Sequence, residues 1–167
     1  MSGAGGAQRA GAVRHAPDRD ETPDERADRN MNELLQELRV ALPGVQVLFA
    51  FLLAVPFQQR FADVTTFQQK TYFVVLLLSA AATAFLIAPS AYHRINFAQG
   101  DKPHIVRMAN RLALAGLFFL VLAMTGAVLL VTDVLFGSAT VTVTTAATAL
   151  MFAALWFGLP LARRARR

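Results

Sequence analysis

Four long apolar runs, separated by polar connectors, dominate the hydrophobic pattern of this chain. They cover residues 41–57, 72–91, 112–132 and 141–161. About 20 apolar residues in a helix cross the ~30 Å hydrocarbon core of a bilayer, and a helix satisfies its own backbone polar groups there. The pattern therefore predicts an all-α, polytopic membrane protein whose four transmembrane helices lie in residues 41–161.

An amphipathic segment, residues 22–42, precedes the first apolar run. Its apolar residues recur at helical spacing: Met31, Leu34, Leu35, Leu38 and Leu42. Thr22 and Glu25 have the spacing of a capping box, which predicts that a helix begins at this threonine. Its polar face carries Glu33 and Glu37, whereas helices that lie on lipid have a polar face rich in Lys and Arg. We therefore favour the cytoplasmic start of the first span over a membrane-surface or partner-binding helix.

The two ends of the chain lack this pattern. Residues 1–21 are rich in glycine and alanine and carry mixed charges, so they bury too little apolar surface to offset the entropy of ordering. We expect a disordered cytoplasmic tail there. Residues 162–167 contain four arginines and are expected to form a basic cytoplasmic tail. Pro43 and Gly44, where the amphipathic segment meets the first run, predict a kink.

Positive charge is distributed unevenly along the chain. The net charge is +5, and Lys and Arg number six before the first span, two in the first connector, four in the second, none in the third and four after the last. Segments rich in Lys and Arg stay in the cytoplasm. Both termini and the second connector are therefore predicted to be cytoplasmic, in a multi-pass protein of the cell inner (cytoplasmic) membrane. Because the charges lie outside the apolar runs, they indicate orientation in a bilayer, and we expect no nucleic-acid partner.

The second connector, residues 92–111, is the candidate contact site. It holds Tyr92, His93, Arg94, Lys102, Arg107 and Arg111. Each Lys or Arg close to an anionic leaflet adds on the order of 1 kcal/mol of attraction. We expect these six residues to contact the headgroups of anionic phospholipids at the inner leaflet, or a partner.

The residue types of the chain do not favour catalysis or a bound cofactor. There is no cysteine, and His93 and His104 lie eleven residues apart and outside the spans. Haem in a helix bundle needs axial ligands that project inward from the spans, and zinc needs three or four closely placed ligands. We therefore expect no catalytic residue, no metal, no cofactor and no enzymatic activity.

Two functions remain, and small residues bear on both. Such residues lie in the second span at Ser79, Ala80, Thr83, Ala84 and Ala88, and in the fourth at Thr142, Ala146, Ala154 and Gly158. Small residues let a partner helix approach closely, which favours a non-enzymatic interaction or accessory protein. The alternative is a small ion or solute transporter. Ion coupling normally uses an acid within a span, whereas Asp63 and Asp133 lie at the outer rim, and four helices would need a homo-oligomer to form a path.

Four stretches of the chain resemble a family of small four-helix membrane proteins. They are Arg29 to Arg39, Gly44 to Leu53, Ala88 to Arg94, and Asn110 to Leu114. The resemblance is to an uncharacterised actinobacterial family, a domain of unknown function, and covers about residues 28–163. Some members are labelled sodium:proton antiporters. The resemblance thus implies the same four-helix membrane fold, and none of its motifs is catalytic.

The predicted orientation can be tested with reporter fusions. Fusions after Arg167 and within residues 97–102 should report the cytoplasm, and fusions near Asp63 or Gly137 the exterior, because Lys- and Arg-rich segments are retained inside. Alkaline phosphatase and fluorescent-protein reporters give opposite signals on the two sides. An exterior signal from the C-terminal fusion would contradict an even number of spans.

Overall fold

The computed structural model of the chain describes residues 22–96 and 102–165, and its long elements there are all helices. They are α1 (Pro23–Ala54), α2 (Thr66–Asn96), α3 (Lys102–Leu135), α4 (Ser138–Ala153) and α5 (Leu159–Ala165). Short 3₁₀ turns (Val55–Phe57 and Gln59–Asp63) connect α1 to α2, and a π-helical turn (Ala154–Gly158) joins α4 to α5. In the described part, four helical segments are long and apolar enough to cross a membrane. The predicted all-α fold with four membrane-spanning helices is confirmed.

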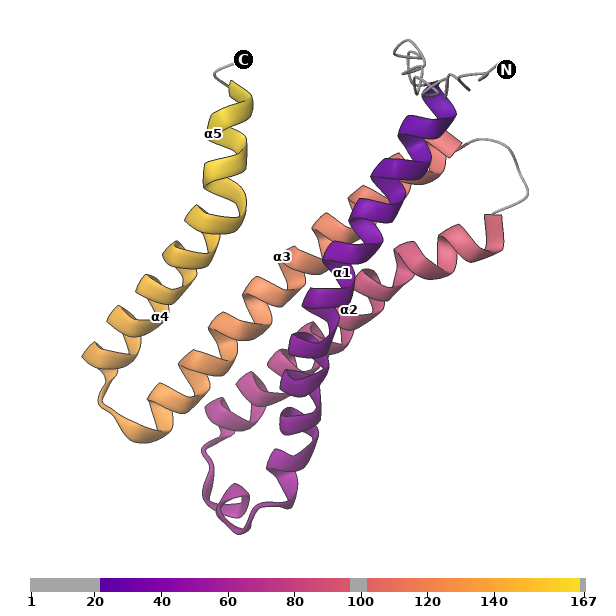
Figure 1. The fold of residues 1–167 in the computed structure, drawn as a ribbon. Helices are drawn as coiled ribbons and strands as arrows, with labels where there is room; N and C mark the ends of the chain where they lie inside the picture. The colour runs from indigo at the N-terminus through magenta and orange to yellow at the C-terminus, as the bar shows by residue number, and fades with distance from the viewer. Residues whose placement is uncertain (1–21, 97–101, 166–167) are drawn as a thin grey trace, which may run out of the picture.

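The helices form an uneven bundle. α2 and α3 pack along each other, α1 packs against both, and α4 packs against α3. Figure 1 shows the start of α1, the start of α3 and the end of α5 at one end of the bundle. The α1–α2 connection and the α3–α4 turn lie at the opposite end. Helix termini that carry most of the charge are thus gathered at one end.

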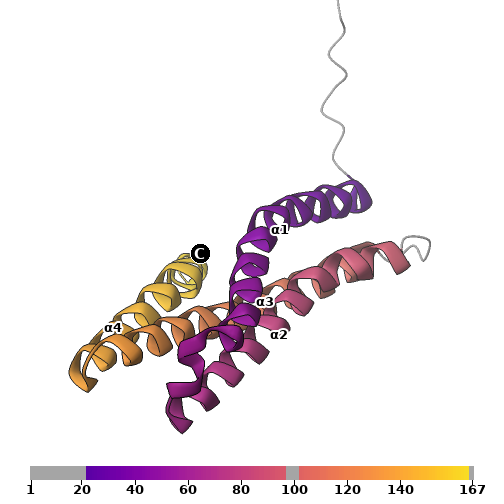
Figure 2. The same cartoon turned by 90° about the horizontal axis from the view of Figure 1, so that it is seen from below.

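α1 begins where the sequence predicts, and it includes both the amphipathic segment and the first predicted span. The Glu25 N–H donates to Thr22 Oγ1 at 3.2 Å and the Thr22 N–H donates to Glu25 Oε2 at 2.9 Å, which confirms the capping box. The amphipathic segment and the first span form a single helix with Pro43 inside it. Figure 2 shows this helix changing direction between its indigo and purple parts. A proline removes one backbone hydrogen bond and crowds the preceding turn, which accounts for the bend.

The polar segments beside the predicted spans are largely helical. The predicted connector of residues 92–111 is helical for most of its length, because α2 continues to Asn96 and α3 begins at Lys102. Likewise α5 continues to Ala165, into the predicted basic tail. The change from apolar to polar residues marks where the hydrocarbon ends, whereas the helix can continue into the headgroup layer. The predicted tail of residues 1–21 lies outside the described residues.

The contact between α2 and α3 follows a seven-residue pattern. On α2 the buried residues alternate spacings of three and four, in the order Tyr72, Val75, Ser79, Ala82, Leu86 and Pro89. The facing row on α3 consists of Ile105, Ala109, Ala113, Gly116, Leu120 and Ala123. This spacing is that of helices packed at a shallow angle with interlocking side chains.

Two glycines of α3 make the close approach possible. A Cβ at Gly116 would lie 2.7 Å from Leu86 Cγ and 3.1 Å from the Leu86 backbone nitrogen. A Cβ at Gly126 would lie 2.5 Å from Val75 Cγ2. Any side chain at these positions would therefore push α2 away from α3.

The small-residue faces predicted from four-residue spacing differ from the packed ones. In α2 only Ser79 of the predicted set is fully buried, and Ala84 is exposed. The reason is that the buried residues of α2 recur every 3.5 residues on average. Residues spaced four apart move off this buried face within two helical turns. In the fourth helical segment the predicted row of Thr142, Ala146, Ala154 and Gly158 is exposed throughout.

Replacing Gly116 should test the close contact. Gly116→Val should lower the free energy of unfolding by about 1–3 kcal/mol, because overpacking forces the helices apart. Adding Leu86→Ala should recover part of the loss by making room for the new side chain. SDS titration of the purified protein, followed by circular dichroism, measures both effects. Gly137→Ala, with no neighbour within 4 Å, should change little; equal losses at the two glycines would contradict the packing.

Candidate functional site

Three helix segments meet at the charged end of the bundle. They are the first half of α1, the last turns of α2 and the first turns of α3, and we call this region the three-helix junction. It contains all six residues predicted as contacts, from Tyr92 to Arg111. It also contains the acidic residues of α1, so charges of both signs lie side by side there.

An apolar cluster holds the junction together. Met31 of α1 is 3% exposed, and it packs with Ile105 and Ala109 of α3, which are 8% and 0% exposed. Tyr92, at the end of α2, packs against the same cluster. The apolar face of the first half of α1 is thus covered by α3 and α2. A helix whose apolar face is covered in this way has none left to insert into the lipid surface.

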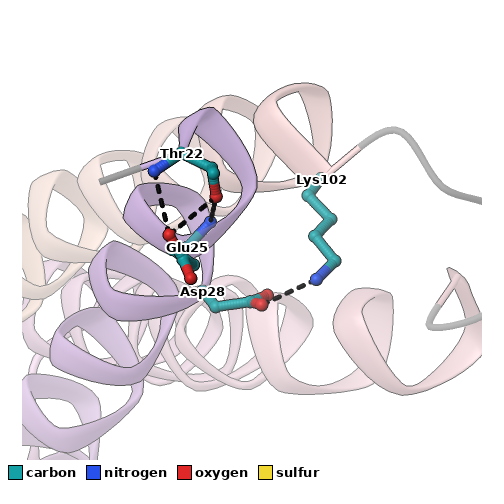
Figure 3. A network of polar contacts seen from close by, with 4 residues as sticks. All are labelled: Thr22, Glu25, Asp28 and Lys102. Atoms are coloured by element: carbon teal, nitrogen blue, oxygen red, sulfur yellow. Dashed lines mark hydrogen bonds and ion pairs between the residues drawn. The ribbon is translucent and has the colours of Figure 1, made fainter. Parts of the chain in front are cut away.

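An ion pair joins α1 to α3 beside this cluster. The Lys102 ammonium donates to Asp28 Oδ2 at 2.6 Å (Figure 3). The Asp28 hydrogen bond raises the pKa of Lys102 above its ordinary value, and the charge of Asp24 adds to the effect. Lys102 lies at the start of α3, ten residues before the predicted third span. It therefore stays cationic throughout the physiological pH range.

A cavity of about 500 Å³ opens next to this ion pair. Its polar lining comes from Asp28 and Asn32 of α1, His93 of α2 and Lys102 of α3. The apolar part of its wall includes Met31 and its neighbours. Side chains from all three helices thus converge on one space, with charged groups of both signs beside an apolar floor.

The six predicted contact residues are distributed unequally around this cavity. His93 and Lys102 line it, while Tyr92 belongs to the apolar cluster. Arg107 lines two adjoining shallow hollows, one of them shared with Arg26 of α1. Arg94 and Arg111 are exposed on the helix surfaces. The structure therefore divides the set into cavity residues, a packing residue and exposed cations.

Two cavity residues of α1, Asp28 and Asn32, were not predicted from the sequence. They flank Met31 on the amphipathic helix, and the sequence alone does not indicate that this helix folds onto α3. A usable signal was present: Ala27 and Met31, both buried, continue the apolar stripe N-terminally. Polar residues at the border of such a stripe lie at the edge of whatever the stripe packs against.

Polar contacts also join the helices at the opposite end. The Gln68 side-chain amide donates to Asp133 Oδ2 at 2.9 Å, between the start of α2 and the end of α3. The Tyr72 hydroxyl donates to the backbone carbonyl of Leu52 at 2.9 Å. Gln68 also completes a capping box with Thr65. Asp133 is therefore a half-buried carboxylate at the rim with a neutral hydrogen-bond donor.

Truncating Met31 should loosen the junction. Met31→Ala should destabilise the docking of the first half of α1 by about 2 kcal/mol, because it removes buried side-chain volume from the cluster. Hydrogen–deuterium exchange of residues 23–42 should then accelerate while exchange in α2 and α3 changes little. Val40→Ala is the matched control, since Val40 is on the same helix and 82% exposed. Equal exchange in the two variants would contradict the docking of α1.

Comparison with known proteins gives one assignment. Neither a curated protein nor a solved structure matches the chain. A family model does match, and it covers residues 20–160, which include every described element from α1 to the start of α5. The chain therefore belongs to a family of unknown function, DUF6328.

Proposed function

We propose that this protein is a non-enzymatic interaction or accessory protein of the cytoplasmic membrane. In this proposal both termini are cytoplasmic and the three-helix junction faces the inner leaflet. The observation that carries the proposal is the gathering of Arg94, Lys102, Arg107 and Arg111 at the junction. The opposite end has Arg60 and Lys70 beside Asp63 and Asp133.

Exposure supports a role for the cations in lipid contact. Arg94, Arg107 and Arg111 are all exposed, and long basic side chains can reach from a helix to the headgroup layer. Each contributes on the order of 1 kcal/mol of attraction to an anionic leaflet. The bilayer and its anionic phospholipids are therefore the first partners we propose. The exposed acidic side chains of α1 are available for contact with a protein partner.

The second candidate function is antiporter-like transport by a homo-oligomer. One observation favours it: Asp133 is half-buried and hydrogen-bonded to Gln68, so a carboxylate stands at the rim of the bundle. Ion coupling normally uses a carboxylate deeper in the membrane, where low dielectric strengthens its response to the ion. The central part of every span is free of acids, so we rank transport second.

The proposed lipid contact predicts a charge-dependent insertion. Replacing Arg94 and Arg111 together by Glu should lower the fraction of protein inserted with the junction facing the anionic leaflet, because two attractions become repulsions. Protease protection in phosphatidylglycerol vesicles measures that fraction. Gln58→Glu with Gln59→Glu is the matched control, since both glutamines are exposed in the opposite connection and acids influence orientation weakly.

Two outcomes would contradict the proposal. Equal insertion of the two double variants would mean that the arginines serve something other than lipid. Sodium–proton exchange by proteoliposomes, abolished by Asp133→Asn, would favour the transport function instead. Both measurements use the same reconstituted protein, so they can be compared directly.

A further inference from the structure

The cavity at the three-helix junction has the features of a ligand site. At about 500 Å³ it lies within the ~300–1,000 Å³ that small-molecule sites usually enclose. Figure 1 shows the end of α2 diverging from the starts of α1 and α3, and the cavity lies where these three segments separate. The arrangement of three helices therefore forms this cavity.

The cavity offers both signs of charge at one place. The Asp28 carboxylate and the Lys102 ammonium form a pair at its edge, with side chains 53% and 42% exposed. Because the pair is open to solvent, a ligand can exchange with it. A simple anion would be attracted by the ammonium of Lys102 and repelled by the carboxylate of Asp28. A ligand that carries a phosphate and an ammonium can satisfy both residues at once.

The wall beside the charges is apolar. Ala27, Met31 and Ile105 contribute to it, and all three side chains are largely buried in the protein. An apolar wall next to a charged rim fits an amphiphile, whose headgroup and hydrocarbon part are covalently joined. A fully polar solute would leave this wall in contact with water, at a cost in free energy.

The level of the cavity along the bundle matches the headgroup layer. Gln68 and Asp133 hold the opposite rim, and 25 residues separate Gln68 from His93. At 1.5 Å per residue this is about 38 Å of helix. The hydrocarbon core is ~30 Å thick, and ~40–45 Å with the headgroups. α2 is therefore long enough for His93 to lie in the headgroup layer when Gln68 lies at the opposite rim.

We propose that this cavity binds the headgroup of a zwitterionic phospholipid, phosphatidylethanolamine in type. The phosphate lies toward Lys102 and the ammonium toward Asp28, with the glycerol end of the lipid against the apolar wall. This deepens the proposed function and rests on its assignment of the junction to a membrane leaflet. The exposed arginines attract anionic lipid in general, whereas the cavity selects one headgroup.

Lipid retention by the full-length protein tests the proposal. The detergent-purified protein is mixed with phosphatidylethanolamine, phosphatidylglycerol or phosphatidylcholine, and bound lipid is counted by native mass spectrometry. Phosphatidylethanolamine should bind about tenfold more tightly than either of the others, the worth of one charge-assisted hydrogen bond. Phosphatidylglycerol lacks the ammonium, and the choline nitrogen has no N–H to donate to Asp28.

Two single variants separate recognition from folding. Asp28→Asn keeps a hydrogen-bond acceptor for Lys102 and removes the negative charge, so the preference should shift from phosphatidylethanolamine to phosphatidylglycerol. Lys102→Gln should weaken binding of both lipids by about tenfold. Glu33→Gln is the control, because Glu33 is exposed on the same helix and pairs with Arg29. A loosened fold would weaken every lipid alike and could not reverse a preference.

Three outcomes would overturn the inference. The first is equal binding of the three lipids by the wild-type protein, and the second is an unchanged preference in Asp28→Asn. The third concerns the source of the headgroup: soluble phosphoethanolamine that displaces the lipid at equal concentration would identify a soluble phosphorylated amine as the ligand. Failure of the proposed function would be seen in a different measurement, the insertion yield of the double variant at Arg94 and Arg111.

Discussion

The close packing of α2 on α3 is the constraint on which the rest of the structure depends. Gly116 admits Leu86 and Gly126 admits Val75, so two long helices touch in the middle and toward the α3–α4 turn. This contact brings Gln68 within 2.9 Å of Asp133. In lipid the hydrophobic effect cannot drive helix association, because hydrocarbon is as apolar as leucine. Close van der Waals contact must do so, and glycine at the contact is what permits it.

The packing of the helices is different at the charged end of the bundle. Beyond Pro89, Tyr92 of α2 packs against the cluster of Met31, Ile105 and Ala109. Over these last turns α2 diverges from the starts of α1 and α3 (Figure 1). The space that opens is lined by the polar residues that flank this apolar cluster. The α2–α3 contact is therefore close at the rim, and a cavity adjoins it at the junction.

Hydropathy predicted the number and type of the helices but could not predict which faces meet. Phe51 is 71% exposed and Phe118 52% exposed, whereas Leu86 is 0% exposed, and all three are equally apolar in the sequence. In a soluble protein such a difference would appear as an amphipathic pattern, but in lipid both faces are apolar. The capping box at Thr22 was predictable because both of its members are local. The Asp28–Lys102 pair joins residues 74 positions apart. It could not be predicted, because most exposed charged residues form no such pair and the sequence does not show which ones do.

Charge complementarity accompanies the apolar docking of the first half of α1. Its acids would be unfavourable on an anionic leaflet, yet they suit the cationic start of α3, where Asp28 meets Lys102. α1 is held along its length, by Met31 at the junction and by Leu38, Val45 and Leu52 in the core. Pro43 lies between two of these anchors and interrupts the backbone hydrogen bonding, and Gly44 has no neighbour within 4 Å.

α1 and α3 differ in their continuity, because Pro43 interrupts the hydrogen bonding within α1. In the described part of the chain, α3 packs against α1, α2 and α4, and it runs without a proline beyond its second residue. Lys102 lies at the start of this helix and Asp133 near its end, about 47 Å apart along the helix axis. α3 is therefore the one helix that contributes both to the charged junction, through Lys102, and to the opposite rim, through Asp133.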